Sequence, residues 1–110
     1  MNDSTPQLSS GQIRQLAEDL PIPESGKQTL VLSDDAQAKV MLFAFAAGHG
    51  LTEHQAPLPA TIQLIQGEAI LTVGEDSVGG KAGTWIQMAA GTPHSIKAET
   101  PVVMLLTLFK

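Results

Sequence analysis

The 110-residue sequence predicts a single-domain, all-β fold: an antiparallel barrel or sandwich preceded by one short helix. Three observations lead to this prediction. From Lys27 onward, apolar residues recur with a period of two in short runs rich in Val, Ile, Leu and Thr. Gly, Pro and Asp separate these runs at near-even spacing, which is typical of sandwiches and barrels. No helical pattern follows Pro21, which argues against a parallel α/β sheet.

Strands are expected over six apolar runs, and the segment 74–80 is expected to form a hairpin turn. The runs cover residues 27–33, 38–46, 60–66, 68–74, 84–89 and 102–109. Two of them, 38–46 and 102–109, are apolar on both faces, whereas a strand exposed on one face alternates more cleanly. We therefore expect their outer faces to be covered by the N-terminal helix or by a partner chain, which favours a homodimer.

The helix is expected over residues 9–20. Ser9 and Gln12 have the S-x-x-Q spacing of a capping box, and prolines at 21 and 23 end the helix. An apolar stripe follows from the spacing i, i+3, i+4 and i+7 of Ile13, Leu16, Ala17 and Leu20. The expected organisation is therefore an N-terminal arm with a helix over 1–26 and a barrel over 27–110.

Composition excludes several classes of function. The absence of cysteine rules out disulfides, thiolate metal sites and cysteine nucleophiles. The net charge of −5 is spread along the chain without a basic run, so no nucleic-acid partner is expected. The start of the sequence lacks a signal-peptide pattern, and the apolar runs are shorter than the roughly 20 residues that span a bilayer. We expect a cytoplasmic protein without a membrane partner.

Glycines and histidines recur with a distinctive spacing in two segments. These read Gly48-x5-His54-x-Ala56-x3-Ala60-x6-Gly67 and Gly83-x5-Ala89-x-Gly91-x2-His94-x3-Ala98. The spacing resembles the two motifs of the cupin superfamily, G-x5-H-x-H-x(3,4)-E-x6-G and G-x5-P-x-G-x2-H-x3-N, and the likeness covers about residues 27–109. The stretch EHQAP at 53–57 resembles small stand-alone cupins. The resemblance implies an antiparallel, RmlC-like jelly-roll barrel, also called a double-stranded β-helix, in which His54 and His94 converge.

The same resemblance raises the question of a metal. A typical metal-binding cupin supplies three imidazoles and a carboxylate, and only His54 and His94 match that set. Ala56 and Ala60 stand where the second histidine and the glutamate would be. A methyl group donates no lone pair, and most protein metal sites use three or more ligands. A site for Fe, Zn, Ni or Mn is therefore degenerate, and the cofactor is either such a divalent metal or none.

Other residues are candidates for the same pocket. His49 becomes a third metal donor if Gly48 and Gly50 bend the chain toward the interior. Gln63 and Gln87 are amides in otherwise apolar strands, where they either line the cavity or bond neighbouring backbone.

Two larger side chains complete the candidate set. Met88 is a candidate for the pocket wall. Trp85, the one tryptophan, is expected in the core or at an interface, with the cavity wall as the alternative.

Three functions remain open. The leading hypothesis is a small-molecule-binding cupin in which His54 and His94 supply polar recognition from an apolar wall. The alternative is a metal-dependent oxygenase or isomerase that uses both histidines with His49, Gln63 or Gln87 as an unconventional third ligand. The third is an interaction module whose dimer surface is the functional part. Fold alone does not choose among them.

Overall fold

The computed structural model describes residues 7–8 and 11–110. Within this part the chain forms eleven β-strands and no helix. The strands are β1 (Gln7–Leu8), β2 (Gly11–Gln12), β3 (Lys27–Asp34), β4 (Ala38–Phe45), β5 (Gly50–Gln55), β6 (Ala60–Gln66), β7 (Ala69–Val73), β8 (Asp76–Gly80), β9 (Trp85–Met88), β10 (Pro93–Ala98) and β11 (Val102–Phe109). The predicted all-β class is confirmed.

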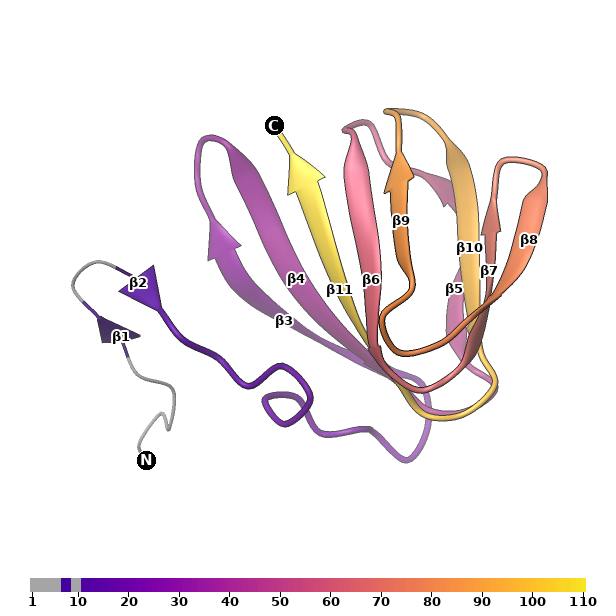
Figure 1. The fold of residues 1–110 in the computed structure, drawn as a ribbon, viewed down its shortest axis with the longest axis horizontal. Coiled ribbons are helices and arrows are strands. Elements are labelled where there is room, and N and C mark those ends of the chain that lie inside the picture. The colour runs from indigo at the N-terminus through magenta and orange to yellow at the C-terminus, as the bar shows by residue number, and fades with distance from the viewer. Residues whose placement is uncertain (1–6, 9–10) are drawn as a thin grey trace.

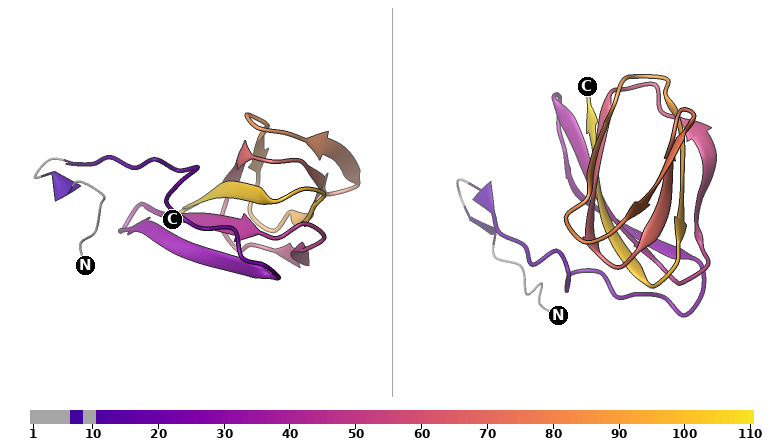
Figure 2. Two further views of the ribbon diagram at one scale, coloured as in Figure 1. Left: turned by 90° about the horizontal axis from the view of Figure 1, so that it is seen from below. Right: turned by 45° about the vertical axis from the view of Figure 1, so that its right-hand side comes forward.

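Two antiparallel sheets form the body of the molecule. One has the strand order β3-β4-β11-β6-β9 and the other the order β5-β10-β7-β8. The sheets face each other around a common interior, while β1 and β2 form a separate two-stranded sheet beside β3 (Figures 1 and 2). The predicted antiparallel arrangement is therefore confirmed. Among the described residues, no helix is long and apolar enough to cross a membrane.

The interior between the sheets is a packed apolar core. Period-two alternation places one set of side chains from each strand in this core, as in β6, where Ile62 and Leu64 are buried and Gln63 is exposed. The buried members of the core are Phe43, Phe45, Ala60, Ile62, Leu64, Ala69, Leu71, Met88, Ile96, Ala98, Val102 and Met104. Side chains from both sheets therefore fill much of the barrel interior.

A second apolar cluster lies on the outer face of the five-stranded sheet. Its buried members from the sheet are Leu42, Ala44 and Val103, which lie on the opposite side of β4 and β11 from the core. Leu20 is buried against them, and the N-terminal segment adds the half-buried Leu16 and Ile22. The segment before β3 thus covers the outer face of the two strands whose sequences are apolar on both sides.

This covering segment is not a helix, so the predicted short N-terminal helix is wrong. The proposed cap, Ser9, lies outside the described residues. Between residues 15 and 19 a single turn forms, in which the N–H groups of Glu18 and Asp19 both donate to the Gln15 carbonyl at 3.0 Å. A helix of this length has little stability by itself. The extended chain instead lets the Gln12 side chain donate to the Leu32 carbonyl at 2.9 Å and places Leu20 on the sheet.

Two details of the barrel also differ from expectation. Residues 76–80, expected within a hairpin turn, form strand β8, which pairs with β7 along its whole length. Its Ser and Gly residues carry little strand propensity, and the pairing with β7 decides the structure. His54 is the penultimate residue of β5, a strand that the six expected runs do not include.

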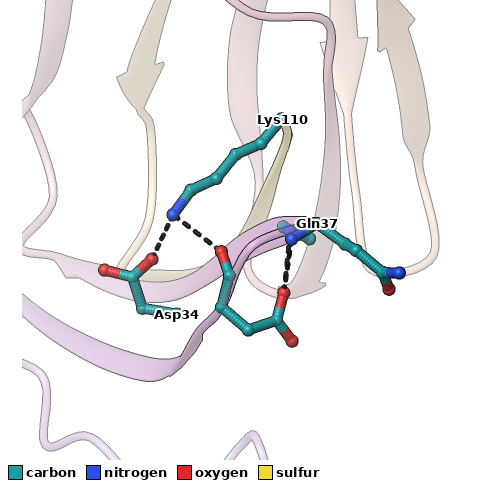
Figure 3. Close-up of polar contacts among 5 residues, drawn as sticks. Asp34, Gln37 and Lys110 are labelled. Atoms are coloured by element: carbon teal, nitrogen blue, oxygen red, sulfur yellow. Dashed lines mark hydrogen bonds and ion pairs between the residues drawn. The ribbon is translucent and has the colours of Figure 1, made fainter.

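Lys110 forms hydrogen bonds that hold the turn between β3 and β4 (Figure 3). The Lys110 ammonium donates to the Asp34 carboxylate at 2.5 Å and to the Asp35 carbonyl at 2.8 Å. The Asp35 carboxylate accepts the backbone N–H groups of Gln37 and Ala38 at 2.8 and 3.0 Å. The hydrogen bond from Lys110 lowers the pKa of Asp34, and the two backbone bonds lower the pKa of Asp35.

These pKa shifts predict a stability difference that depends on pH. A carboxyl group whose pKa is lower in the folded chain than in the unfolded chain stabilises the folded state. The stabilisation is fully present at pH values above the unfolded pKa, which is near the ordinary value of 3.8. It is lost as the pH falls through the folded pKa. Asp34→Asn is therefore expected to be less stable than the wild type at pH 7 and equally stable near pH 2. Urea unfolding at both pH values measures this, and a deficit that persists unchanged at pH 2 would contradict it.

Candidate functional site

The fold places His54 and His94 side by side. They are direct partners in the antiparallel pairing of β5 with β10, and their ring centroids are 4.2 Å apart with the planes tilted by 58°. The register shifts between the pairs His94–His54 and Ile96–Leu51. In this interval β5 has two residues, where β10 has one, so β5 bulges. This bulge puts Leu51 and His54 on the same face, although they are three residues apart. The two imidazoles therefore meet at one end of the barrel.

Both imidazoles are held in the same tautomer by the backbone. Nδ1 of His54 lies 2.8 Å from the Thr52 carbonyl oxygen, and Nδ1 of His94 lies 2.9 Å from the Thr92 carbonyl oxygen. A carbonyl only accepts hydrogen bonds, so each Nδ1 carries the proton and donates it. In the neutral ring, each Nε2 is therefore an acceptor, the state in which an imidazole accepts a ligand's hydrogen bond or coordinates a metal.

The Nε2 atoms remain available for a ligand. Neither forms a hydrogen bond to any of the described residues. His94 is only 6% exposed. Every fully buried side-chain nitrogen or oxygen in the described part has a hydrogen-bond partner. Because Nε2 of His94 has none, this atom is in contact with solvent. His54 is exposed. The pair thus lies at the mouth of the barrel, above the packed core.

Loop contacts hold the two histidine-bearing strands together. The Gly91 N–H donates to the Ala56 carbonyl at 2.8 Å, which ties the segment after β5 to the segment before β10. On the other side of His94, the Gly74 N–H donates to the Pro93 carbonyl at 2.8 Å. The loop glycines therefore fix the position of His94 through their backbone groups.

The donor set does not fit the metal that the motif resemblance implies. Two imidazoles are adjacent, but Ala60, which is 2% exposed in the core, and Ala56 supply only methyl groups. Among residues 7–8 and 11–110, no three or more His, Cys, Asp or Glu side chains are grouped so that they could hold a metal ion. A resident ion usually has at least three protein ligands. The residues present therefore do not fit a resident metal ion.

The structure does not bring His49 to the pair. It lies in the loop that precedes β5, whereas His54 lies near the other end of that strand, so roughly 16 Å of extended chain separates them. Nε2 of His49 lies 3.5 Å from the Ser25 hydroxyl instead. The bend at Gly48 and Gly50 does not carry the side chain to the barrel mouth.

The two glutamines and the tryptophan lie on the outside. Gln63 pairs with Trp85, both are exposed, and they alternate with the core residues Ile62 and Leu64. Gln87 is exposed on the same outer face. Met88, by contrast, is 4% exposed within the core. The sequence did contain a signal for the outward position of Gln63. Its neighbours at one residue on either side, Ile62 and Leu64, are apolar and lie on the inner face, so alternation places Gln63 on the outer face.

Two grooves lie beside β5. The larger, of about 630 Å³, opens on the outer face of the four-stranded sheet, and its lining includes Ile70, Glu53 and Lys97 but neither His54 nor His94. The smaller, of about 320 Å³, runs along the free edge of β5 toward β3. Its lining consists of Lys27, Gly50, Leu51, Thr52 and His54, and we call it the seam groove. Sequence reasoning missed Lys27, because a lysine at a strand start carries no local signal of a site.

Comparison with known proteins supports the fold assignment. No protein-family model matches the chain, and no curated protein matches it. Solved structures do. A conserved protein of unknown function from Streptococcus pyogenes has a TM-score of 0.82 and 21% identity, with 99% of this chain and 96% of that chain covered. A cupin superfamily protein from Desulfitobacterium hafniense has a TM-score of 0.81 and 21% identity, with 86% of each chain covered.

A third similar structure is a cupin 2 conserved barrel domain protein from Leptotrichia buccalis. It has a TM-score of 0.80 and 28% identity, and the match covers 86% of this chain and 46% of that one. The described fold is also similar to those of RmlC-like cupin structures from Shewanella frigidimarina, with a TM-score of 0.74, and Desulfovibrio desulfuricans, with a TM-score of 0.79. The predicted resemblance to the cupin superfamily is confirmed.

Proposed function

We propose that the chain is a small-molecule-binding cupin in which His54 and His94 recognise the polar part of the ligand without a resident metal. One observation carries the proposal: two adjacent imidazoles, each oriented by a backbone carbonyl, keep their Nε2 atoms free at the barrel mouth. The apolar residues Leu51 and Val73 flank the pair in the pairing of β5, β10 and β7. Polar groups set in apolar surroundings are typical of ligand sites.

The chemistry of the pair defines what it can recognise. Two neutral imidazoles with acceptor Nε2 atoms bind ligand groups that donate, such as hydroxyl or amide N–H groups. Fixed orientation reduces the conformational entropy that the side chains lose on binding, which improves affinity for a given contact. Catalysis by metal-activated water or dioxygen would need further donors, which supports binding over the metal-dependent enzyme.

A thermal-shift screen against small metabolites tests the proposal. A ligand at 100 times its Kd adds about 2.7 kcal/mol of stability, which raises the Tm of a domain of this size by several degrees. We expect such a rise for the wild type, its loss in His94→Ala, and its retention in the matched control His49→Ala. A chelator is expected to leave the rise unchanged. A rise that survives His94→Ala, or that vanishes with EDTA, would overturn the proposal.

We also propose that the chain is a homodimer formed through the outer face of β6 and β9, which the N-terminal segment leaves open beside β11. Trp85 is 58% exposed there, and the outward residues around it, Gln63 and Gln87, carry no charge. In a chain with a net charge of −5, an uncharged face is the surface on which two copies meet with least repulsion. An exposed tryptophan is the residue type most enriched at interface centres.

Charge insertion on this face tests the dimer. Trp85→Glu places a carboxylate from each copy near the centre of the interface, and we expect a monomer by sedimentation velocity at micromolar concentration, where the wild type is a dimer. Ile70→Glu makes the same change at a site 38% exposed on the other sheet and should leave the dimer intact. A monomeric wild type, or equal effects of both variants, would contradict this surface.

A further inference from the structure

The seam groove has an unusual charge. Its lining contains one cation, Lys27, and no acidic side chain, although the chain as a whole carries a net charge of −5. The nearest acid along β5, Glu53, lines the larger groove on the other side of the strand. The bulge in β5 keeps the Glu53 carboxylate on that outer side. An anion in the seam groove therefore meets a cation without a competing carboxylate in the lining.

The Lys27 ammonium is not used by the fold. Within the described residues it forms no hydrogen bond or ion pair, whereas Lys110 is bonded to Asp34 and to the Asp35 carbonyl. Lysine is a compact point charge with three donors, so one ammonium neutralises one monoanionic group. The groove has no second cation in its lining. This charge count favours a carboxylate over a dianionic phosphate.

The groove also offers a hydrogen-bond acceptor. His54 lines it, and with Nδ1 bonded to the Thr52 carbonyl, its neutral ring presents Nε2 as an acceptor. Lys27 lies at the start of β3 and Gly50 at the start of β5, while His54 lies near the end of β5. The groove thus combines a cation from β3 with an acceptor and the apolar Leu51 from β5.

We propose that the seam groove binds a straight-chain hydroxy-carboxylate, with its carboxylate on Lys27, its methylene groups on Leu51 and its hydroxyl donating to Nε2 of His54. This inference rests on the proposed function and names the ligand class for the His54 side of that site. The groove volume of about 320 Å³ lies at the lower limit of small-molecule sites and suits such a compact ligand. Lys27 is the residue that selects for the anion.

Calorimetric titration of the full chain with hydroxy acids from hydroxybutanoate to hydroxyoctanoate, and with their methyl esters, tests the inference. We expect one chain length to bind best and its ester to bind on the order of tenfold more weakly. Lys27→Met should weaken the acid to the level of the ester, while Lys27→Arg should retain binding. Lys97→Met, which removes a lysine from the larger groove, is the matched control and should leave binding unchanged.

The outcomes separate this inference from the function on which it rests. Equal binding of acid and ester, lost in His54→Ala, would overturn the role of Lys27 while the histidine site stands. Equal losses in Lys27→Met and Lys97→Met would show attraction by overall charge and would overturn a specific site. If no acid of the series binds while another metabolite stabilises the chain through His94, the ligand class is wrong and the small-molecule function stands. If neither occurs, both fail.

Discussion

Replacing Gly67 with alanine is expected to lower the free energy of unfolding by about 3 kcal/mol or more. Gly67 has a φ of +90°, a region that costs an L-residue about 1–2 kcal/mol. A Cβ atom there would also collide with the backbone carbonyl of Pro101 and the side chain of Val102. Val102 is fully buried, so the chain cannot shift without disturbing the core. Urea unfolding measures the loss.

Gly91→Ala provides the matched control. Gly91 has a similar φ of +80°, but nothing lies within 4 Å of the Cβ that alanine would add. This variant bears only the conformational penalty, about 1–2 kcal/mol. A deficit at Gly67 no larger than that at Gly91 would show that the contact with Pro101 relaxes freely.

Most of the barrel was predictable because most of its strands have one face in the core. In β6, burial of Ile62 and Leu64 against exposure of Gln63 is the alternation that marks a strand in the sequence. The signal fails where a strand buries little. β8 was read as a turn because its side chains are mostly exposed and its structure comes from pairing with β7. Pairing partners are not visible in a local pattern.

The N-terminal segment shows the limit of helical periodicity. Leu16 and Leu20 have helical spacing, and both do reach the outer face of the sheet. An extended chain with one turn satisfies the same burial, and Ile13, the first member of the stripe, is 53% exposed. Tertiary packing therefore buries the apolar residues of this segment without the helix that their spacing predicts.

The candidate site was predictable in part for a similar reason. Motif spacing brought His54 and His94 together although 40 residues separate them, and the structure places them in direct register. Gln63 and Gln87 were chosen by residue type alone, and their strands turn them outward. Lys27 becomes a candidate only because β3 and β5, the edge strands of two different sheets, lie next to each other, and this neighbourhood follows from the topology. Long-range neighbours of this kind carry no signal in a single sequence.

Restoring the two metal donors that Ala56 and Ala60 replace is expected to have a large effect on metal binding. If the histidine pair is oriented for ligation and lacks only partners, Ala56→His with Ala60→Glu should create a metal site. By the motif resemblance, these two positions carry the second histidine and the glutamate. We expect the double variant to hold near one equivalent of zinc per chain by plasma mass spectrometry, where the wild type holds less than about a tenth.

The stability of the double variant sharpens the test. Ala60 is 2% exposed, so a glutamate there is buried, and without metal the variant should be less stable than the wild type. Zinc at 100 times its Kd should restore about 2.7 kcal/mol and raise the Tm by several degrees, with no such rise in the wild type. Adding His94→Ala should abolish both the zinc and the rise. A double variant that folds and binds no zinc would mean that His54 and His94, though adjacent, are not aimed at a common point, and the pair would then recognise its ligand through two separate contacts.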